Sequence, residues 1–306
     1  MSARRAMSVG SCVAALVACS DGASSTGAPW SDASAIDATI DATIEVAPND
    51  AVTSDAPTLD SEVSGDAALG LEGGTYFFEL DAAPFPGTGH PDVAVHVPPG
   101  FRPDSNVGCI VYFHGFDNCV TNVVGNVDSP CPPDTTVRAA THLSDQLDAA
   151  KVNAFLVAVE IDYDQATGNP GALANKGQLA ALMHELLTEH LAAIFGRTVD
   201  VAALSRVVIG SHSGGYEAAA MSISVGGLTS ITEVDLYDSL YGYLTTYDDW
   251  VTTHLARFDA TRADRLRFAT EYTAGGGTAV NARAMAASAE TWVGDAGLEA
   301  SLLFDD

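Results

Sequence analysis

The sequence predicts an α/β fold with a doubly wound, mostly parallel β-sheet, preceded by a disordered tether. Short apolar runs rich in β-branched residues recur through residues 75–306, and helix-forming stretches separate most of them. Strands that alternate with helices form a parallel sheet with helices on both faces. The tether is indicated by a change of composition over residues 20–74, which are rich in Ala, Ser, Thr, Asp, Gly and Pro.

Each expected element rests on its own local pattern. The most regular is an amphipathic helix over 179–194, where Leu and Met side chains recur on one face and Gly196 stands where the C-cap belongs. A shorter helix is expected over 250–258. Apolar or alternating runs predict strands at 75–80, 93–97, 109–113, 155–159, 207–209, 234–237 and 266–270.

The first residues have the pattern of an export signal. Arg4 and Arg5 precede a short apolar stretch that ends at Cys19, too short to remain as a membrane span. Leu16-Val17-Ala18-Cys19 resembles a bacterial lipobox, whose cysteine becomes acylated. The resemblance implies that residues 1–19 are a lipoprotein signal peptide. We therefore expect an exported bacterial lipoprotein at the outer membrane or cell surface, held to the membrane through its lipid anchor only.

Residues 20–74 are expected to form a disordered acidic linker. No Lys or Arg occurs between Arg5 and Arg102, and the run over 35–44 places Ile at every fourth position among Asp, Thr and Ala. So few Ile side chains bury too little surface to offset the chain entropy of ordering. A flexible chain of this length reaches on the order of 40 Å, enough to hold residues 75–306 clear of a membrane surface.

The charge balance excludes some partners. The chain carries 40 acidic and 13 basic residues, a formal net charge of −27, so nucleic acid and anionic lipid surfaces would repel it. No His or Cys spacing has the pattern of a metal site, and no cofactor is expected.

Cysteine spacing predicts one disulfide. Cys119 and Cys131 flank a turn-rich segment, and an exported protein can join them with a gain of about 3 kcal/mol. Cys109 lies within an expected strand, where it acts as a small buried hydrophobe.

A tight turn at Ser213 is the centre of the expected functional site. The apolar run 207–209 is followed by Ser211-His212-Ser213-Gly214-Gly215 and then by Ala-rich, helix-forming sequence. This is the pattern of a nucleophile elbow, in which the residues two before and two after the nucleophile are small. Ser211 stands where Gly is usual, a small residue in place of another. Ser213 is the candidate nucleophile, whereas His212 is expected to point away from the site.

These residues resemble the α/β-hydrolase superfamily over residues 75–306. His114-Gly115-Phe116, after the expected strand at 109–113, is similar to the His-Gly oxyanion loop of that family. The resemblance implies oxyanion donors at the backbone amides of Gly214 and Phe116, each typically contributing about 10² to 10³ in rate.

The resemblance also implies an acid and a histidine base. Asp238 follows the expected strand at 234–237 and is the preferred acid, with Glu271 as its rival one strand later. No histidine follows His254, which falls within an expected helix. Residues 302–304 could begin a last strand. We therefore expect either that the chain is C-terminally truncated or that it has lost the base.

The resemblance implies a serine hydrolase of carboxylic ester or amide bonds that acts through an acyl-enzyme on a small-molecule or polymeric substrate. The missing base predicts little turnover from this chain. One alternative is a catalytically inactive binding lipoprotein of the same fold. A metal-dependent carbohydrate deacetylase is disfavoured, because no His/Asp cluster has ligand spacing.

Overall fold

The computed structural model describes residues 70–88, 91–166, 168–259, 261–273 and 276–297. Cys19, residues 20–69 of the expected linker and the apolar residues 302–304 lie outside these ranges. None of the described helices is long and apolar enough to cross a membrane.

The described residues alternate strands and helices, as the apolar runs predict. In chain order the elements are β1 Gly74–Phe78, β2 Val93–Val97, β3 Val107–Phe113, α1 Val120–Val124, β4 Ser129–Pro130, β5 Val137–Arg138, α2 Leu143–Ala150, β6 Ala154–Val159, α3 Gln178–Glu185, α4 Leu191–Phe195, β7 Leu204–His212, α5 Tyr216–Ser224, β8 Ile231–Tyr237, α6 Leu244–Thr253, β9 Arg267–Glu271 and α7 Gly277–Ala296. Short 3₁₀ turns occur at Gly171–Ala174, Val201–Ala203, Ser213–Gly215 and Leu255–Arg257.

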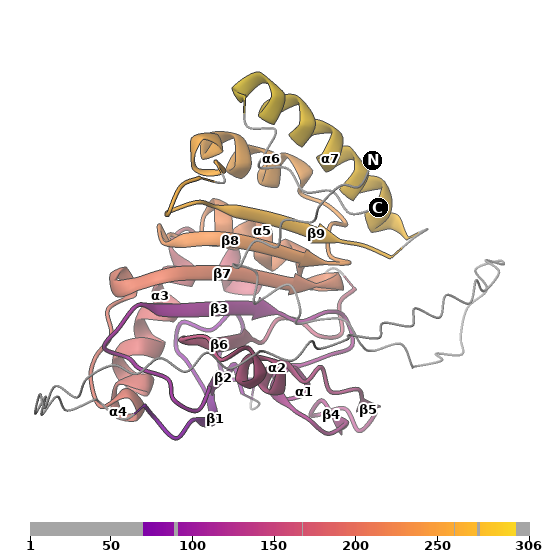
Figure 1. Cartoon of the computed structure of the whole chain (residues 1–306). Helices are drawn as coiled ribbons and strands as arrows, with labels where there is room; N and C mark the ends of the chain where they lie inside the picture. Colours follow the sequence, from indigo (N-terminus) through magenta and orange to yellow (C-terminus); the bar gives the residue numbers. More distant parts are fainter. Residues whose placement is uncertain (1–69, 89–90, 167, 260, 274–275, 298–306) are drawn as a thin grey trace, which may run out of the picture. The chain divides into compact units, whose positions relative to one another are not determined.

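The main sheet is mixed and mostly parallel, in the order β1-β2-β6-β3-β7-β8-β9 (Figure 1). β1 and β2 pair antiparallel, β2 and β6 pair antiparallel, and the strands from β6 through β9 are all parallel. β4 and β5 form a separate two-stranded ladder. The α/β fold class with a mostly parallel sheet is therefore confirmed.

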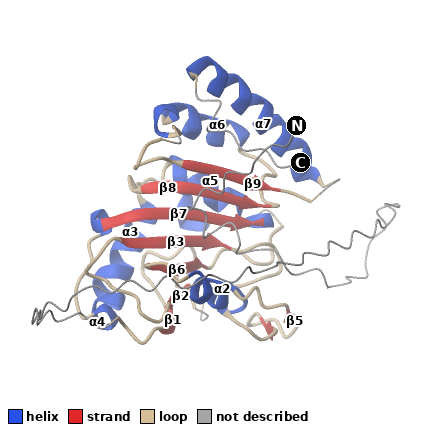
Figure 2. Cartoon of the chain, in the orientation of Figure 1, coloured by secondary structure: helices blue, strands red, loops and turns tan. Residues whose placement is uncertain are grey.

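Helices cover both faces of the sheet (Figure 2). Buried side chains of α3 to α7 join one large apolar cluster on one face, and those of α1 and α2 join a smaller cluster on the other. β2 and most of β3 are buried, as expected of strands covered on both sides. Val, Ile and Phe dominate these strands because their stiff side chains pack well on a pleat.

Two expected elements differ in detail. The first strand ends at Phe78, because the Leu80 amide leaves the ladder and donates to the Asp92 carboxylate at 2.7 Å. The helix expected over 179–194 is continuous but contains a π-helical turn at Leu186–His190. That turn accommodates an extra residue within the helix. Gly196 ends the helix with φ of +66°, as predicted.

β3 lies where the chain reverses direction across the sheet. From β3 the chain crosses through α1 and α2 to β6 on one side, then through α3 and α4 to β7 on the other side. In open α/β sheets such a switch point opens a crevice at the carboxyl ends of the strands. The residues that follow β3 and β7 are therefore the first place to look for a functional site.

Candidate functional site

Strand register brings three loops to one edge of the sheet. Phe113 at the end of β3 pairs with Ser211 of β7, and His212 pairs with Tyr237 at the end of β8. Because these strands are parallel, the residues that follow them leave the sheet side by side. The structure thus brings His114–Phe116, Ser213 and Asp238 to the same edge.

Ser213 occupies the turn between β7 and α5 in a strained backbone conformation. Its φ is +47°, in the left-handed region that residues with a Cβ adopt rarely. The 3₁₀ turn at Ser213–Gly215 then leads directly into α5. A non-glycine residue held in this conformation on a strand-to-helix turn is the backbone signature of a nucleophile elbow.

Close packing explains why the neighbours of Ser213 are small. A Cβ atom at Gly215 would lie 2.6 Å from the Phe113 carbonyl oxygen, and one at Gly115 would lie 3.0 Å from the Ser213 Cβ. A Cβ atom at Gly214 would lie 3.1 Å from the Phe116 nitrogen. The loop after β3 therefore packs directly against the elbow, with the Phe116 amide close to Gly214.

Ser211 braces the turn. Its side chain is fully buried, and its hydroxyl lies 2.8 Å from that of Ser239, which donates to the Ser213 carbonyl oxygen at 2.9 Å. With Ser239 donating to the carbonyl, Ser211 donates to Ser239. This relay gives Ser211 a role that a Gly in its place cannot have. The sequence shows only that Ser211 is small, because Ser239 reaches it from the loop after β8.

Asp238 also has a left-handed backbone, with φ of +45°. Its carboxylate accepts hydrogen bonds from the hydroxyls of Thr273, at 2.9 Å, and Thr278. Its amide donates to the carbonyl oxygen of Glu271, at 2.8 Å. Glu271 is the last residue of β9 and so still lies within the sheet. Of the two candidate acids, Asp238 is the one beyond its strand end and beside the elbow.

Tyr241 is a site residue that sequence reasoning missed. Burial and the nearby charge of Asp238 raise the pKa of Tyr241, whereas a hydrogen bond with the Ser213 side chain acts to lower it. Its ring is 46% exposed and packs at 5.9 Å from the ring of Tyr216. Phe116, on the opposite loop, is 50% exposed. Two accessible aromatic side chains therefore belong to the loops around Ser213.

Among the described residues, no hydrogen bond or ion pair joins a histidine to Ser213 or Asp238. His254 lies at the end of α6, where its Nδ1 is 2.8 Å from the Trp250 carbonyl oxygen and its ring packs on Trp250. His254 therefore has a packing role there.

His212 lies closer to the site than expected. Its Nδ1 is 2.8 Å from where a Cβ of Gly115 would be, so the ring packs under the loop that follows β3. Burial lowers the pKa of His212, and the charge of Asp238 opposes that effect. The expectation that His212 points away from the site is thus only partly right, because its ring lies against Gly115 and within reach of the charge of Asp238.

The remaining sequence predictions concern cysteines and metals. Cys119 and Cys131 form the predicted disulfide, and Cys109 is a free thiol buried in β3, where desolvation raises its pKa. Within the described ranges, no group of three or more His, Cys, Asp or Glu side chains has the arrangement of a metal site.

The sequence matches no protein-family model and no curated protein sequence. Solved structures with some similarity include the feruloyl esterase module from Clostridium thermocellum complexed with sinapinate, at 13% identity over 65% of this chain and 67% of that chain, with a TM-score of 0.40. Esterase B from Lactobacillus rhamnosis is 12% identical over 74% and 73%, at 0.38. The poly(3-hydroxybutyrate) depolymerase from Bordetella parapertussis is 12% identical over 67% and 73%, at 0.33.

The arrangement suits attack on a carbonyl carbon. The strained turn carries the Ser213 hydroxyl, and the start of α5 and the loop after β3 bring backbone amides close to it. A tetrahedral intermediate at Ser213 would develop negative charge on an oxygen that such amides can bind.

Proposed function

We propose that this chain is a serine hydrolase of carboxylic ester or amide bonds, with Ser213 as its nucleophile. The observation that carries the proposal is the left-handed backbone of Ser213 on a turn against which Gly115 and Phe116 pack directly. In this mechanism the Ser213 oxygen attacks the substrate carbonyl carbon, and the new oxyanion accepts hydrogen bonds from the Gly214 and Phe116 amides. Collapse of the intermediate, with the proton lost by Ser213 passing to the leaving group, expels the alcohol or amine and leaves an acyl-enzyme, which water then hydrolyses.

When the Ser213 oxygen attacks, a base must accept the proton of its hydroxyl. Tyr241 bonds to the Ser213 side chain, but its raised pKa keeps the phenol protonated near neutral pH, so it cannot accept the Ser213 proton. Loss of the base alone typically costs on the order of 10⁶ in kcat in enzymes of this mechanism. We therefore propose that this chain reacts slowly by itself, and that Asp238 serves as the acid that orients a base.

A fluorophosphonate probe tests the proposal directly. Such a probe phosphonylates activated serines and places its oxygen where the oxyanion binds. We expect weak labelling of the 306-residue chain, stimulation by added imidazole as a substitute base, and no labelling of Ser213→Ala. Strong labelling without imidazole that His254→Ala abolishes would instead assign the base to His254.

The alternative is a catalytically inactive binding protein. It is favoured by the lack of a histidine bonded to Ser213 in the described part of the chain, and by the exposed rings of Phe116 and Tyr241. No labelling of the chain, with or without imidazole, would support this alternative.

We also propose that the chain is tethered to a membrane through acylated Cys19. The apolar run that ends in Leu-Val-Ala-Cys, before a long polar segment, supports this proposal. Cys19→Ala should move the protein from the membrane fraction to the soluble fraction. Equal membrane association of the variant would contradict the tether.

A further inference from the structure

The loop Gly115–Asp117 needs fixing if its Phe116 amide is to bind an oxyanion. The side chain of Phe116 cannot do this, because it is half exposed. Asp117 has φ of +66°, a conformation that persists only where surrounding contacts impose it. Two sets of contacts hold the two ends of this loop, and both are linked to the segment closed by the Cys119–Cys131 disulfide, one through Val120 and the other through Asn122.

The inner contacts run through His114. Its ring is buried, with Nδ1 3.0 Å from the Gly115 carbonyl oxygen. Its Nε2 lies 3.2 Å from the Glu160 carboxylate and 3.2 Å from the Ile161 amide nitrogen. Protonated Nε2 can donate to Glu160, and neutral Nε2 can accept from Ile161. The ring is therefore held in either state.

Glu160 links this histidine to the disulfide segment. Burial acts to lower the pKa of His114, but the charge and hydrogen bond of Glu160, together with the Gly115 carbonyl, outweigh it and raise that pKa. The other carboxylate oxygen of Glu160 accepts from the Val120 amide at 2.9 Å, and Val120 directly follows Cys119. Glu160 is only 4% exposed, so these contacts are shielded from water.

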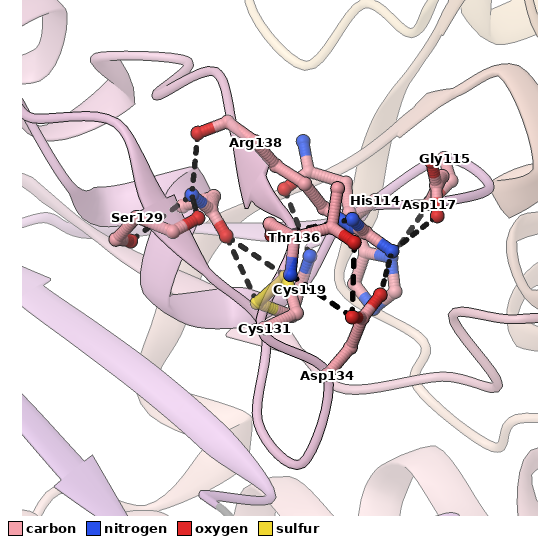
Figure 3. Close-up of polar contacts among 11 residues, drawn as sticks. His114, Gly115, Asp117, Cys119, Ser129, Cys131, Asp134, Thr136 and Arg138 are labelled. Carbon is pink, nitrogen blue, oxygen red and sulfur yellow. Dashed lines mark hydrogen bonds and ion pairs between the residues drawn. A yellow bond between two sulfur atoms is a disulfide. The ribbon is translucent and has the colours of Figure 1, made fainter.

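The outer contacts run through Arg138. Its guanidinium bonds to the carboxylate of Asp117 and, at 2.7 Å, to that of Asp134 (Figure 3). Hydrogen bonds from Thr136 lower the pKa of Asp134, which keeps that carboxylate charged. The Asp117 amide donates to the Tyr163 carbonyl oxygen at 2.7 Å. The far end of the loop is thus fixed through both backbone and side chain.

Both sets of contacts meet in the disulfide-closed segment. The bridge joins Cys119, before α1, to Cys131, after β4. Inside it the buried Asn122 side chain donates to the carbonyl oxygens of Ser129 and Arg138, at 3.0 and 3.2 Å. Opening the bridge would therefore loosen the support of Val120 and that of Arg138 together.

We propose that Glu160 and Arg138, anchored on the Cys119–Cys131 disulfide, are positioning residues that hold the Phe116 amide in place as an oxyanion donor. The inference rests on the proposed function of Ser213. It implies that loosening either support slows the covalent step at Ser213, while the binding of the probe is kept.

The experiment compares Glu160→Ala, Glu160→Gln, Arg138→Ala and the double variant Cys119→Ala with Cys131→Ala. Fluorophosphonate labelling with imidazole gives kinact and KI separately for each. We expect kinact to fall by about 10² in Glu160→Ala and in the double variant, with KI little changed, because one oxyanion donor is misplaced. Glu160→Gln should recover most of kinact, since its amide can still bond to both Val120 and His114. For Arg138→Ala we expect kinact to fall by about tenfold.

Matched controls separate positioning from general damage. Arg262→Ala removes an arginine whose exposed pair with Asp264 lies elsewhere, and Cys109→Ala removes a cysteine without opening the bridge. Both should keep kinact. Unchanged kinact in Glu160→Ala, or an equal loss in Glu160→Ala and Glu160→Gln, would overturn the proposal. If Glu160→Ala fails to fold, unchanged kinact in Arg138→Ala overturns it.

Hydrogen exchange keeps this inference distinct from the proposed function. Exchange at the Asp117 amide, which donates to the Tyr163 carbonyl oxygen, should accelerate in Glu160→Ala and in the double cysteine variant, but not in Arg262→Ala, whether or not Ser213 reacts. Labelling failure in every variant, with accelerated exchange, would refute the hydrolase but keep the support of the loop. Normal labelling of all variants with unchanged exchange would refute the positioning role of Glu160 and Arg138 and would leave the proposed hydrolase function standing.

Discussion

Carboxylates at the two ends of β7, β8 and β9 are held by different kinds of partner. Near the amino ends, Arg206 of β7 and Arg267 of β9 both pair with Glu233 of β8, which is fully buried. At the carboxyl ends, Asp238 is held by threonine hydroxyls and sits in a left-handed backbone. The same three strands thus carry a carboxylate paired with two arginines at one end and, at the other, a carboxylate that threonine hydroxyls hold and that forms no salt bridge within the described residues.

This difference separates a structural role from a functional one. A buried carboxylate between two guanidinium groups joins neighbouring strands, and its removal takes away the carboxylate that both guanidinium groups share. Backbone strain at Ser213 and Asp238 lowers stability and persists because close packing imposes it. Substitutions at the amino end should therefore change stability, and those at the carboxyl end should change reactivity.

The largest effect is expected for Glu233→Ala. Breaking this buried pair should cost about 3 kcal/mol, the low end of such losses, because the two arginine side chains are partly exposed and water can reach them. The melting temperature should fall by about 6–12 °C, as measured by differential scanning fluorimetry. The labelling rate of Ser213 should not change well below that temperature. Glu290→Ala, on the exposed side of α7, is the control and should melt within about 1 °C of the wild type.

At the other end of the strands, Gly214→Ala should affect reactivity. The new Cβ would lie 3.0 Å from the Ala166 carbonyl oxygen and 3.1 Å from the Phe116 nitrogen, so one oxyanion donor must shift. We expect the labelling rate of Ser213 to fall by about 10². Gly294→Ala is the matched control, because nothing lies within 4 Å of its new Cβ. Equal rates for the two variants would show that the Phe116 amide takes no part.

Ser239→Ala should give a smaller effect on stability than Glu233→Ala. It removes the donor to the Ser213 carbonyl oxygen and the acceptor of the buried Ser211 hydroxyl. We expect a loss of about 1–2 kcal/mol in the free energy of unfolding, measured by urea denaturation. Ser224→Ala, which removes a hydroxyl bonded within α5, should lose less. If both variants lose the same free energy of unfolding, the hydrogen bonds through Ser239 do not stabilise the turn.

A further effect is a dependence of stability on pH at Asp235. Burial raises the pKa of this carboxyl to about 6, although Arg267 and Arg206 act to lower it. The folded state therefore binds the proton more tightly than the unfolded state does. Its contribution to stability is complete below about pH 4 and is lost as the pH rises through about 6. We expect a loss of up to about 3 kcal/mol across this range, because the folded-state pKa lies about two above its ordinary value.

Asp235→Asn isolates this contribution, because the amide keeps the shape and cannot titrate. Urea denaturation between about pH 4 and pH 7 should show the wild type losing stability relative to the variant. Parallel curves would mean that the charged neighbours of Asp235 compensate for its burial.

The fold was predictable because the decisive signals are local. β-branched runs predicted the strands, and the small residues around Ser213 predicted the turn. Parallel strands then require the residues after β3, β7 and β8 to share one edge, so the neighbourhood of Ser213, Phe116 and Asp238 followed from the order of the strands. The predicted disulfide formed because Cys119 and Cys131 flank a short, turn-rich segment.

The supports of the site could not be predicted, because each joins residues whose closeness only the folded chain creates. Glu160 is the residue after β6, and nothing in its local sequence indicates that it faces His114. Ser239 and Tyr241 reach the elbow from the loop after β8. The π-helical turn at Leu186–His190 also has no local signal, since the apolar spacing fits a regular helix.

The central position of β3 has a consequence for synthesis on the ribosome. β3 and β6 can pair as soon as β6 emerges, but the other edge of β3 awaits β7, which follows only after residues 160–203. At about 5–20 residues per second this interval lasts on the order of a few seconds. During it an apolar strand edge is open to any chain that can pair with it. The helices α3 and α4, made in that interval, are the first candidates to shield the nascent sheet from aggregation.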